Sequence, residues 1–250
     1  MRINDNVKSI SESLGVLGLG EMAEKMEDSI KDADTRDNVV ATMAVTFSQY
    51  AAERKQHRAD LLFKRSKLNE RTYFDDLWDY PERKLDKEQI EDLSKLGFIS
   101  DRRNLLLEGA SGTGKSWIAG AIATQACGEG IRTRWTLFPG LLKELRDKKA
   151  LPGNAYQSRL KYYAKFDLLC IDEFLNESIN ESDIFIIQEL FELLDRNKHS
   201  LIICTQCDPM KMDQAFKIQS IGQSVRGRIM QRSKIISLRG PDLRLYKPVE

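Results

Sequence analysis

One run of eight residues has the composition and spacing of a phosphate-binding loop. Residues 109–116 read Gly-Ala-Ser-Gly-Thr-Gly-Lys-Ser, which fits the pattern G-x-x-x-x-G-K-[ST]. Glycines let the backbone approach phosphates closely, and the start of a following helix adds positive potential. Lys115 would reach the β- and γ-phosphates, and the Ser116 hydroxyl would bind Mg²⁺. The alternative, a chance glycine-rich turn, fits poorly because an apolar strand pattern precedes the run and a helix pattern follows it.

A second candidate lies downstream, where an apolar segment ends in two acids. Residues 167–173 read Asp-Leu-Leu-Cys-Ile-Asp-Glu, as in a buried strand with carboxylates at its end. Asp172 would hold the Mg²⁺ shell, and Glu173 would orient and polarise the attacking water. Taken alone, two adjacent acids fit an ordinary solvated strand end equally well. The phosphate-binding loop upstream favours the catalytic interpretation.

The two acids also narrow the reaction. A small-molecule kinase transfers phosphate to a bound acceptor and has no need of a water-activating glutamate. A GTPase would carry N-K-x-D, but Asn197 and Lys198 are followed by Ser200 at the Asp position. We therefore expect ATP hydrolysis by water, with Lys115 and Glu173 as catalytic residues and Ser116 and Asp172 as Mg²⁺ ligands.

Two further positions have both a catalytic and an ordinary interpretation. Thr205 or Gln206, at the end of the apolar segment 201–204, could contact the γ-phosphate or could simply begin a turn. Arg228, with Arg226 as a substitute, could reach the nucleotide of a neighbouring subunit or could be a surface arginine. The residues predicted to bind nucleotide are Gly109, Ala110, Ser111, Gly112, Thr113, Gly114, Lys115, Ser116, Trp117, Asp172 and Thr205.

The elements that would position these residues alternate between strands and helices. The apolar patterns predict strands at residues 105–107, 133–138, 167–171, 201–204 and 234–238. They predict helices at residues 115–127, 141–149, 155–165, 182–196 and 220–230. Such alternation is typical of an α/β fold whose five-stranded parallel sheet is covered by helices on both faces. Asp86 with Gln89 predicts a capped helix start, and Ser182 is the predicted cap of the helix that it begins.

The first part of the chain is predicted to be helical. Val7, Ile10 and Leu14 repeat at helical spacing, and a long helix is expected over residues 35–67. Its later half is basic, so its outer face is either solvated or a contact for DNA or a partner. We expect a helical domain at residues 1–70, a linker and helix at 71–100, and the ATPase domain at 101–250.

Composition sets the broad class. The chain has 250 residues with 31% charged side chains and a formal net charge of +1. It has no apolar run long enough for a bilayer and no secretion signal, so we expect a cytoplasmic protein. Its four cysteines lack the partners of a zinc site, and Cys170 and Cys204 are expected in the core. Residues 211–247 contain nine bases and two acids, a balance suited to phosphate binding or to a solvated face.

These motifs together resemble the IstB family of transposition helper ATPases and, more distantly, the DnaC-type helicase loaders. The resemblance covers nearly the whole chain and is carried by residues 17–23, 96–99, 104–109, 167–173, 227–229 and 240–244. It implies an AAA+ core with little or no C-terminal lid, and Arg228 as an arginine supplied to the neighbouring subunit. The sequence departs from the family at Thr205-Gln206-Cys207, at Trp117 and at Asp242.

The resemblance also implies partners. Members form homo-oligomers on ATP, bind duplex DNA and stimulate a transposase. Residues of the long helix, 143–149 and 159–161 would then contact DNA phosphates. Two alternatives stay open: a loader of a replicative helicase, and a nucleotide-binding switch with very weak hydrolysis.

Overall fold

The computed structural model describes residues 3–16, 18–30, 36–79, 86–176 and 179–245. The chain forms two compact units, Met1–Arg58 and Ala59–Glu250, and each is described by itself. The predicted division at residues 70 and 100 remains a prediction. Among the described residues, none of the helices combines the length and apolar character needed to cross a bilayer.

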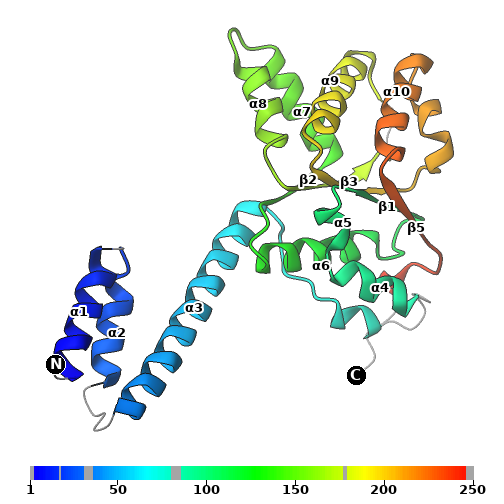
Figure 1. The fold of residues 1–250 in the computed structure, drawn as a ribbon. Coiled ribbons are helices and arrows are strands. Elements are labelled where there is room, and N and C mark those ends of the chain that lie inside the picture. The colour runs from blue at the N-terminus through cyan, green and yellow to red at the C-terminus, as the bar shows by residue number, and fades with distance from the viewer. Residues whose placement is uncertain (1–2, 17, 31–35, 80–85, 177–178, 246–250) are drawn as a thin grey trace. The chain divides into compact units, whose positions relative to one another are not determined.

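The first unit is helical (Figure 1). It contains α1 (Ile3–Val16), α2 (Gly20–Ile30) and the first part of α3 (Arg36–Ser66). Met26 is fully buried and packs against Val7, Ile10, Leu14, Met43 and Phe47. The apolar residues that repeat at helical spacing in the sequence therefore form the core of this unit.

The second unit is built on a five-stranded parallel sheet. Its strands are β1 (Asn104–Gly109), β2 (Thr133–Leu137), β3 (Leu168–Phe174), β4 (Ser200–Thr205) and β5 (Ser233–Leu238). They lie in the order β2-β3-β4-β1-β5, and all four neighbouring pairs are parallel. The predicted α/β fold with a parallel sheet is confirmed.

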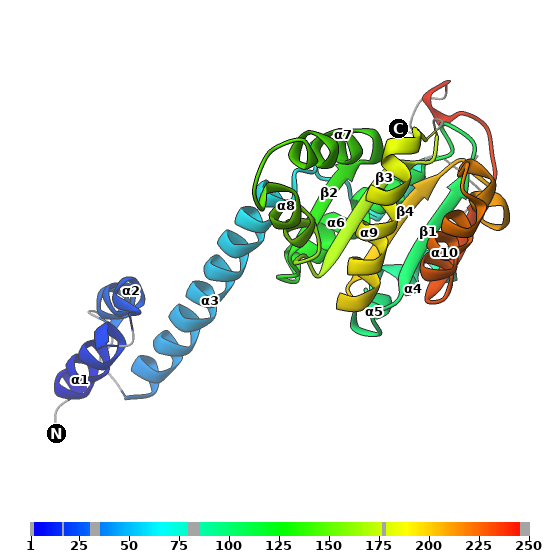
Figure 2. The same cartoon turned by 90° about the horizontal axis from the view of Figure 1, so that it is seen from above.

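Helices cover both faces of this sheet. One face carries α7 (Phe138–Lys149), α8 (Ala155–Tyr163), α9 (Glu181–Asn197) and α10 (Gln219–Met230), and the other carries α4 (Lys87–Ser94), α5 (Gly97–Ser100) and α6 (Lys115–Gly128) (Figures 1 and 2). Short 3-10 segments lie at Asp75–Asp79, Pro209–Ala215 and Leu243–Leu245. The two cores follow from the twofold alternation of strand side chains, because Leu105 and Leu107 face one core and Leu106 the other. Cys170 and Cys204 are buried, as predicted.

Two predicted helix starts have different outcomes. The Asp86 carboxylate accepts a hydrogen bond from the Gln89 N–H at 3.3 Å, which confirms the predicted cap of α4. The predicted Ser182 cap is wrong, since α9 begins at Glu181 and Asn180 occupies the cap position.

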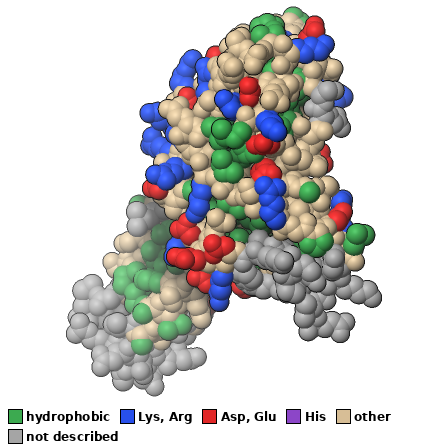
Figure 3. Space-filling view, turned by 90° about the vertical axis from the view of Figure 1, so that its right-hand side faces the viewer, with side chains coloured by type: hydrophobic (Ala, Val, Ile, Leu, Met, Phe, Trp, Pro, Cys, Tyr) green, Lys and Arg blue, Asp and Glu red, His purple; other side chains and the backbone are tan. Residues whose placement is uncertain are grey.

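The basic segment of residues 211–247 is largely neutralised by ion pairs. Seven of its nine bases pair with acids: Lys217–Glu181, Arg226–Asp213, Arg228–Glu192, Arg232–Asp195, Lys234–Asp92, Arg239–Glu108 and Arg244–Asp242. Blue and red side chains are interspersed on the face shown in Figure 3, around a small hydrophobic area. This segment therefore offers less unpaired positive charge than its sequence indicates.

Candidate nucleotide-binding site

The loop between β1 and α6 has a backbone that only glycine accommodates at several positions. Gly112 has φ +77° and Gly114 has φ +92°, both in the left-handed region. A Cβ added at Gly112 would lie 2.0 Å from Asp242 Oδ1, and one at Gly109 would lie 2.5 Å from the Leu238 carbonyl oxygen. The loop is thus a tight cradle at the carboxyl end of β1, directly before the N-terminus of α6.

Lys115 is held inside this loop. Its ammonium group donates hydrogen bonds to the carbonyls of Gly109 and Ala110, each at 2.7 Å. Burial lowers the pKa of Lys115 from its ordinary value, while the nearby Asp172 and Glu108 oppose that shift. The side chain is therefore positioned where a phosphate in the loop would meet a positive charge.

The two acids of β3 are placed differently although they are adjacent. The pairing of β3 with β4 is irregular between Ile171 and Phe174, and Glu173 has φ +57°. Such a conformation costs a non-glycine residue about 1–3 kcal/mol and is often found at functional sites. Asp172 is buried and accepts a hydrogen bond from the Glu173 N–H at 2.9 Å, whereas Glu173 is exposed. The strained backbone thus allows both side chains to reach the same pocket.

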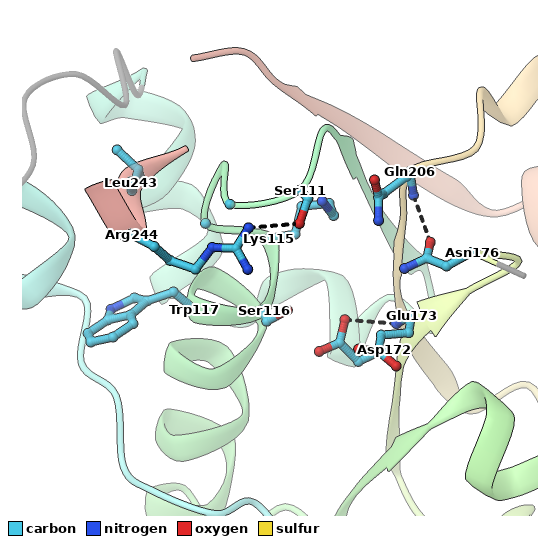
Figure 4. A pocket seen from close by; sticks show the side chains of 12 residues that line it. Ser111, Lys115, Ser116, Trp117, Asp172, Glu173, Asn176, Gln206, Leu243 and Arg244 are labelled. Atoms are coloured by element: carbon cyan, nitrogen blue, oxygen red, sulfur yellow. Dashed lines mark hydrogen bonds between the residues drawn. The ribbon is translucent and has the colours of Figure 1, made fainter. Parts of the chain in front are cut away.

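A cavity of about 370 Å³ brings most of the predicted residues together. Figure 4 shows Asp172 and Glu173 on one side of the loop and Arg244 and Trp117 on the other. The predicted residues that line the cavity are Ser111, Gly112, Gly114, Lys115, Ser116, Trp117, Asp172 and Glu173. Four residues that were not among the predicted nucleotide-binding residues complete the lining: Asn176, Gln206, Leu243 and Arg244.

Thr205 is not among the lining residues. Its side chain is fully buried, and its hydroxyl donates to the Phe174 carbonyl at 2.7 Å and accepts the Cys207 N–H at 3.0 Å. The neighbouring Gln206, the alternative that the sequence left open, lines the cavity, and its N–H donates to Asn176 Oδ1 at 3.3 Å. Of the two residues considered at this strand end, Gln206 therefore lines the cavity and Thr205 does not.

Three other residues that were predicted to bind nucleotide make hydrogen bonds within the loop or hold its lysine. Gly109 and Ala110 provide the carbonyls that hold Lys115, and Thr113 is buried. The Thr113 hydroxyl donates to the Ala110 carbonyl at 2.9 Å. These residues shape the loop, and they do not line the cavity itself.

The segment after β5 returns to the phosphate-binding loop. The Leu243 N–H donates to the Gly112 carbonyl at 3.0 Å, and Arg244 Nη2 donates to Ser111 Oγ at 3.1 Å. Asp242 pairs with Arg244 through both of its oxygens, and this pairing lowers the pKa of Asp242. The sequence motif at residues 240–244 contributed to the resemblance, but nothing in it indicated that Arg244 lies at the nucleotide site.

Arg228 and Arg226 lie elsewhere, on α10. Arg228 pairs with Glu192 at 3.2 Å and donates to Ser224, and Arg226 pairs with Asp213 at 3.5 Å. The carboxyl end of α10, at Met230, lies just before the amino end of β5, at Ser233. Because β5 is parallel to the other strands, Arg228 lies toward the amino ends of the strands. The loop of Lys115 lies at their carboxyl ends. Any contact of Arg228 with nucleotide would therefore involve another subunit.

The donor atoms at the site suit Mg²⁺. Ser116 and Asp172 line the same cavity and offer hydroxyl and carboxylate oxygens, the ligands that this hard cation takes. Among the described residues there is no group of three or more His, Cys, Asp or Glu that could form a metal site of protein ligands alone. Mg²⁺ usually keeps water and phosphate oxygens beside one or two protein ligands, so this set fits.

The fold and the site define a P-loop protein of the AAA+ type, with a parallel sheet, a glycine-rich loop and two acids at the end of β3. The sequence matches the family described as IstB-like ATP binding protein over residues 12–249, and the chain belongs to this family.

Relatives agree with that assignment, and solved structures share the fold. A Bacillus thuringiensis subsp. berliner protein named as an ATP-binding protein of insertion sequence IS232 is 25% identical, over 97% of this chain and 96% of its own. A Pseudomonas fluorescens protein named in the same way for IS1162 is 30% identical, over 72% of this chain and 76% of its own. The fold is similar to a crystal structure of DnaI, with a TM-score of 0.54 and 17% identity over 69% of this chain and 90% of that one. It is also similar to a crystal structure of the DnaC helicase loader, with a TM-score of 0.52 and 18% identity over 60% of this chain and 86% of that one.

Proposed function

We propose that this protein hydrolyses ATP, assembles with ATP on duplex DNA and assists a transposase. The observation that carries the proposal is that Lys115, Ser116, Asp172 and Glu173 line one cavity although they come from two separate segments. Membership of the IstB-like ATP binding protein family supports ATP as the nucleotide. The relatives named for insertion sequences support transposition as the process.

The residues divide the work at the site. Lys115 and the amides at the start of α6 would bind the phosphates, and Ser116 and Asp172 would hold Mg²⁺. The metal supplies neutralisation of phosphate charge when it is bound. Glu173 would orient water for attack, and Arg228 of a neighbouring subunit would complete the site.

The alternative function, loading a replicative helicase, is supported by likeness of fold to DnaI and DnaC alone. The two functions differ in the DNA that they require. A transposition helper binds duplex, whereas a loader would prefer single strands and a helicase partner.

The proposal is tested by fluorescence anisotropy with a random-sequence duplex, with and without ATP, for the wild type and Lys115→Ala. We expect duplex binding that needs ATP and Lys115 and weakens steeply with salt, and we expect matched single strands to compete poorly for the protein. Duplex binding that is absent or indifferent to ATP would contradict the proposal and turn attention to a helicase partner.

A further inference from the structure

A second cavity, of about 760 Å³, lies in the unit Ala59–Glu250. Its walls come from the last turns of α3, the start of β2, and the end of α8 with the segment that follows it, which converge in Figures 1 and 2. It lies at the amino ends of β2 and β3, so it is at the opposite end of the parallel sheet from the nucleotide site. Six basic residues line it: Lys64, Arg65, Lys67, Arg132, Arg134 and Lys165.

The lining of this cavity contains no acidic residue. Arg132 is neutralised by Asp167, with two hydrogen bonds of 2.8 Å. Within the part of the chain that the structure describes, no ion pair joins any of the other five bases to a carboxylate. By contrast, the two shorter basic stretches predicted to contact DNA, at residues 143–149 and 159–161, contain bases that are paired with acids, as in Lys143–Asp147, Arg146–Asp183 and Arg159–Glu144. Lys64 and Arg65 belong to the third predicted stretch, the basic half of the long helix.

Aromatic rings, and not carboxylates, contact two of these five bases, Arg134 and Lys165. Around the Tyr162 ring, Lys165 lies 4.6 Å, Arg159 4.7 Å and Arg134 5.7 Å from the centroid. Phe166 packs edge-on against Tyr162 and has Lys165 5.6 Å from its own centroid. A ring attracts a cation through its quadrupole and leaves the net charge in place, whereas a carboxylate would cancel it.

Arg134, at the cavity wall, also has no carboxylate partner among the described residues. Its Nη1 donates to the Arg65 carbonyl at 3.5 Å, and its buried Nε has no hydrogen-bond acceptor among the described residues. A buried donor without an acceptor costs free energy. A site that concentrates like charges and leaves a donor unsatisfied is suited to an anionic ligand with several charges.

We infer that this cavity binds the phosphodiester backbone of a DNA strand. Basic side chains on three segments match a ligand with regularly spaced charges, and half-buried aromatic rings beside them are typical of grooves that bind nucleic acid strands. The inference rests on the proposed function in one respect, that DNA is the polyanion, and it adds the site. An acidic partner protein is the competing occupant.

The test compares two variants with equal loss of charge. The cavity variant carries Lys64→Gln, Arg65→Gln and Lys165→Gln, and the control carries Lys95→Gln, Arg103→Gln and Lys211→Gln. All six side chains are exposed, and the control residues do not line the cavity. Anisotropy is measured on a labelled duplex and on its matched single strand over a range of salt, and fluorescent ADP reports nucleotide affinity.

We expect the cavity variant to bind DNA about tenfold more weakly or worse, with a salt slope smaller by roughly 2–3, while the control changes little. Both variants should keep the nucleotide affinity of the wild type, because the cavity and the nucleotide site are at opposite ends of the sheet. Tyr162→Leu, which changes no charge, should weaken DNA binding roughly threefold, since the ring positions the cations.

Three outcomes would overturn the inference: DNA binding by the cavity variant at the control's affinity, equal losses in both variants, or no DNA binding by the wild type. Failure of the proposed function looks different. If duplex binding by the wild type ignores ATP and Lys115, that function fails, and the cavity is still judged by the two variants alone.

Discussion

Glu173 provides the most direct test of the chemistry at the scale of the residue. Glu173→Gln keeps the size of the side chain but removes the carboxylate that would polarise water. We expect ATP binding to persist and hydrolysis to fall by roughly 10²–10⁴-fold. Phosphate release measures hydrolysis, and Glu91→Gln, an exposed change on α4, is the control. Unchanged hydrolysis would remove Glu173 from the proposed mechanism.

Asp242 is expected to weaken nucleotide binding. Its carboxylate lies against Gly112 and pairs with Arg244, which in turn donates to Ser111. Because Arg244 lowers the pKa of Asp242, the carboxylate stays charged throughout the neutral range and below it. Asp242→Asn removes a negative charge from the loop that would bind phosphates and should tighten ADP binding by up to about fivefold. Titration with fluorescent ADP measures this, and weaker binding would show that the carboxylate helps to position Arg244.

Chemistry that needs particular residue types was predictable from the sequence, and chemistry that depends on the path of the chain was not. Lys115, Ser116, Asp172 and Glu173 occur in two short motifs, and the structure places them in one cavity. Asn176 belongs to no motif, and the motif at residues 240–244 did not indicate that Arg244 lies at the nucleotide site. Both residues reach the cavity because Glu173, near the end of β3, and Leu175, directly after it, have left-handed backbone, and because the chain after β5 returns to Gly112.

At the scale of the element, α10 offers a matched pair of glycines. A Cβ at Gly222 would lie 2.7 Å from the Asp213 carbonyl oxygen, whereas a Cβ at Gly227 meets nothing within 4 Å. Gly222→Ala should therefore destabilise the protein by about 1–3 kcal/mol. Gly227→Ala should stabilise it by up to about 1 kcal/mol through helix propensity. Urea denaturation measures both, and equal effects would mean that α10 can move away from the segment Pro209–Ala215.

A charged clamp joins the starts of two neighbouring strands. Arg132 precedes β2, Asp167 precedes β3, and the two are joined by paired hydrogen bonds of 2.8 Å. Both side chains are more than a third exposed, so we expect Asp167→Asn to cost only about 0.5–1 kcal/mol. Asp147→Asn, in an exposed pair on α7, is the control and should cost less.

The pH dependence of this clamp has a defined sign. Arg132 lowers the pKa of Asp167 below the ordinary value of 3.8. The stabilisation is therefore complete above the pKa of the unfolded chain and is lost as the pH falls through the folded value. The difference between wild type and Asp167→Asn should be constant near neutral pH and shrink below about pH 4. A difference that grows on acidification would assign the effect to another group.

The strands were predictable because they are short apolar runs, and a parallel sheet buries them on both faces. The start of α9 was not predictable in this way. Asn180, Glu181 and Ser182 all suit the beginning of a helix, and the local sequence does not decide among them. Nor did the sequence indicate that most bases of residues 211–247 would pair with acids from distant segments, such as Lys234 with Asp92.

At the scale of the whole molecule, the site is incomplete within one chain if Arg228 acts as proposed. Arg228 is held by Glu192 and Ser224 on its own subunit and does not line its own nucleotide cavity. Arg228→Ala should leave the affinity of the isolated chain for ADP unchanged and lower hydrolysis roughly 10³-fold or more. Glu192→Gln, which removes the ion pair but keeps the arginine, should retain hydrolysis.

Mixing two inactive variants tests whether the arginine acts between subunits. Arg228→Ala keeps its own Glu173, and Glu173→Gln keeps its own Arg228. In a mixed assembly with ATP, the Glu173→Gln subunit supplies an arginine to the intact cavity of its Arg228→Ala neighbour, so hydrolysis should return to a substantial fraction of the wild-type rate. Hydrolysis that stays at the sum of the two separate variants would show that Arg228 acts within its own chain or only supports α10. Size-exclusion chromatography with ATP confirms that the mixed subunits associate, so the absence of recovery is not an absence of assembly.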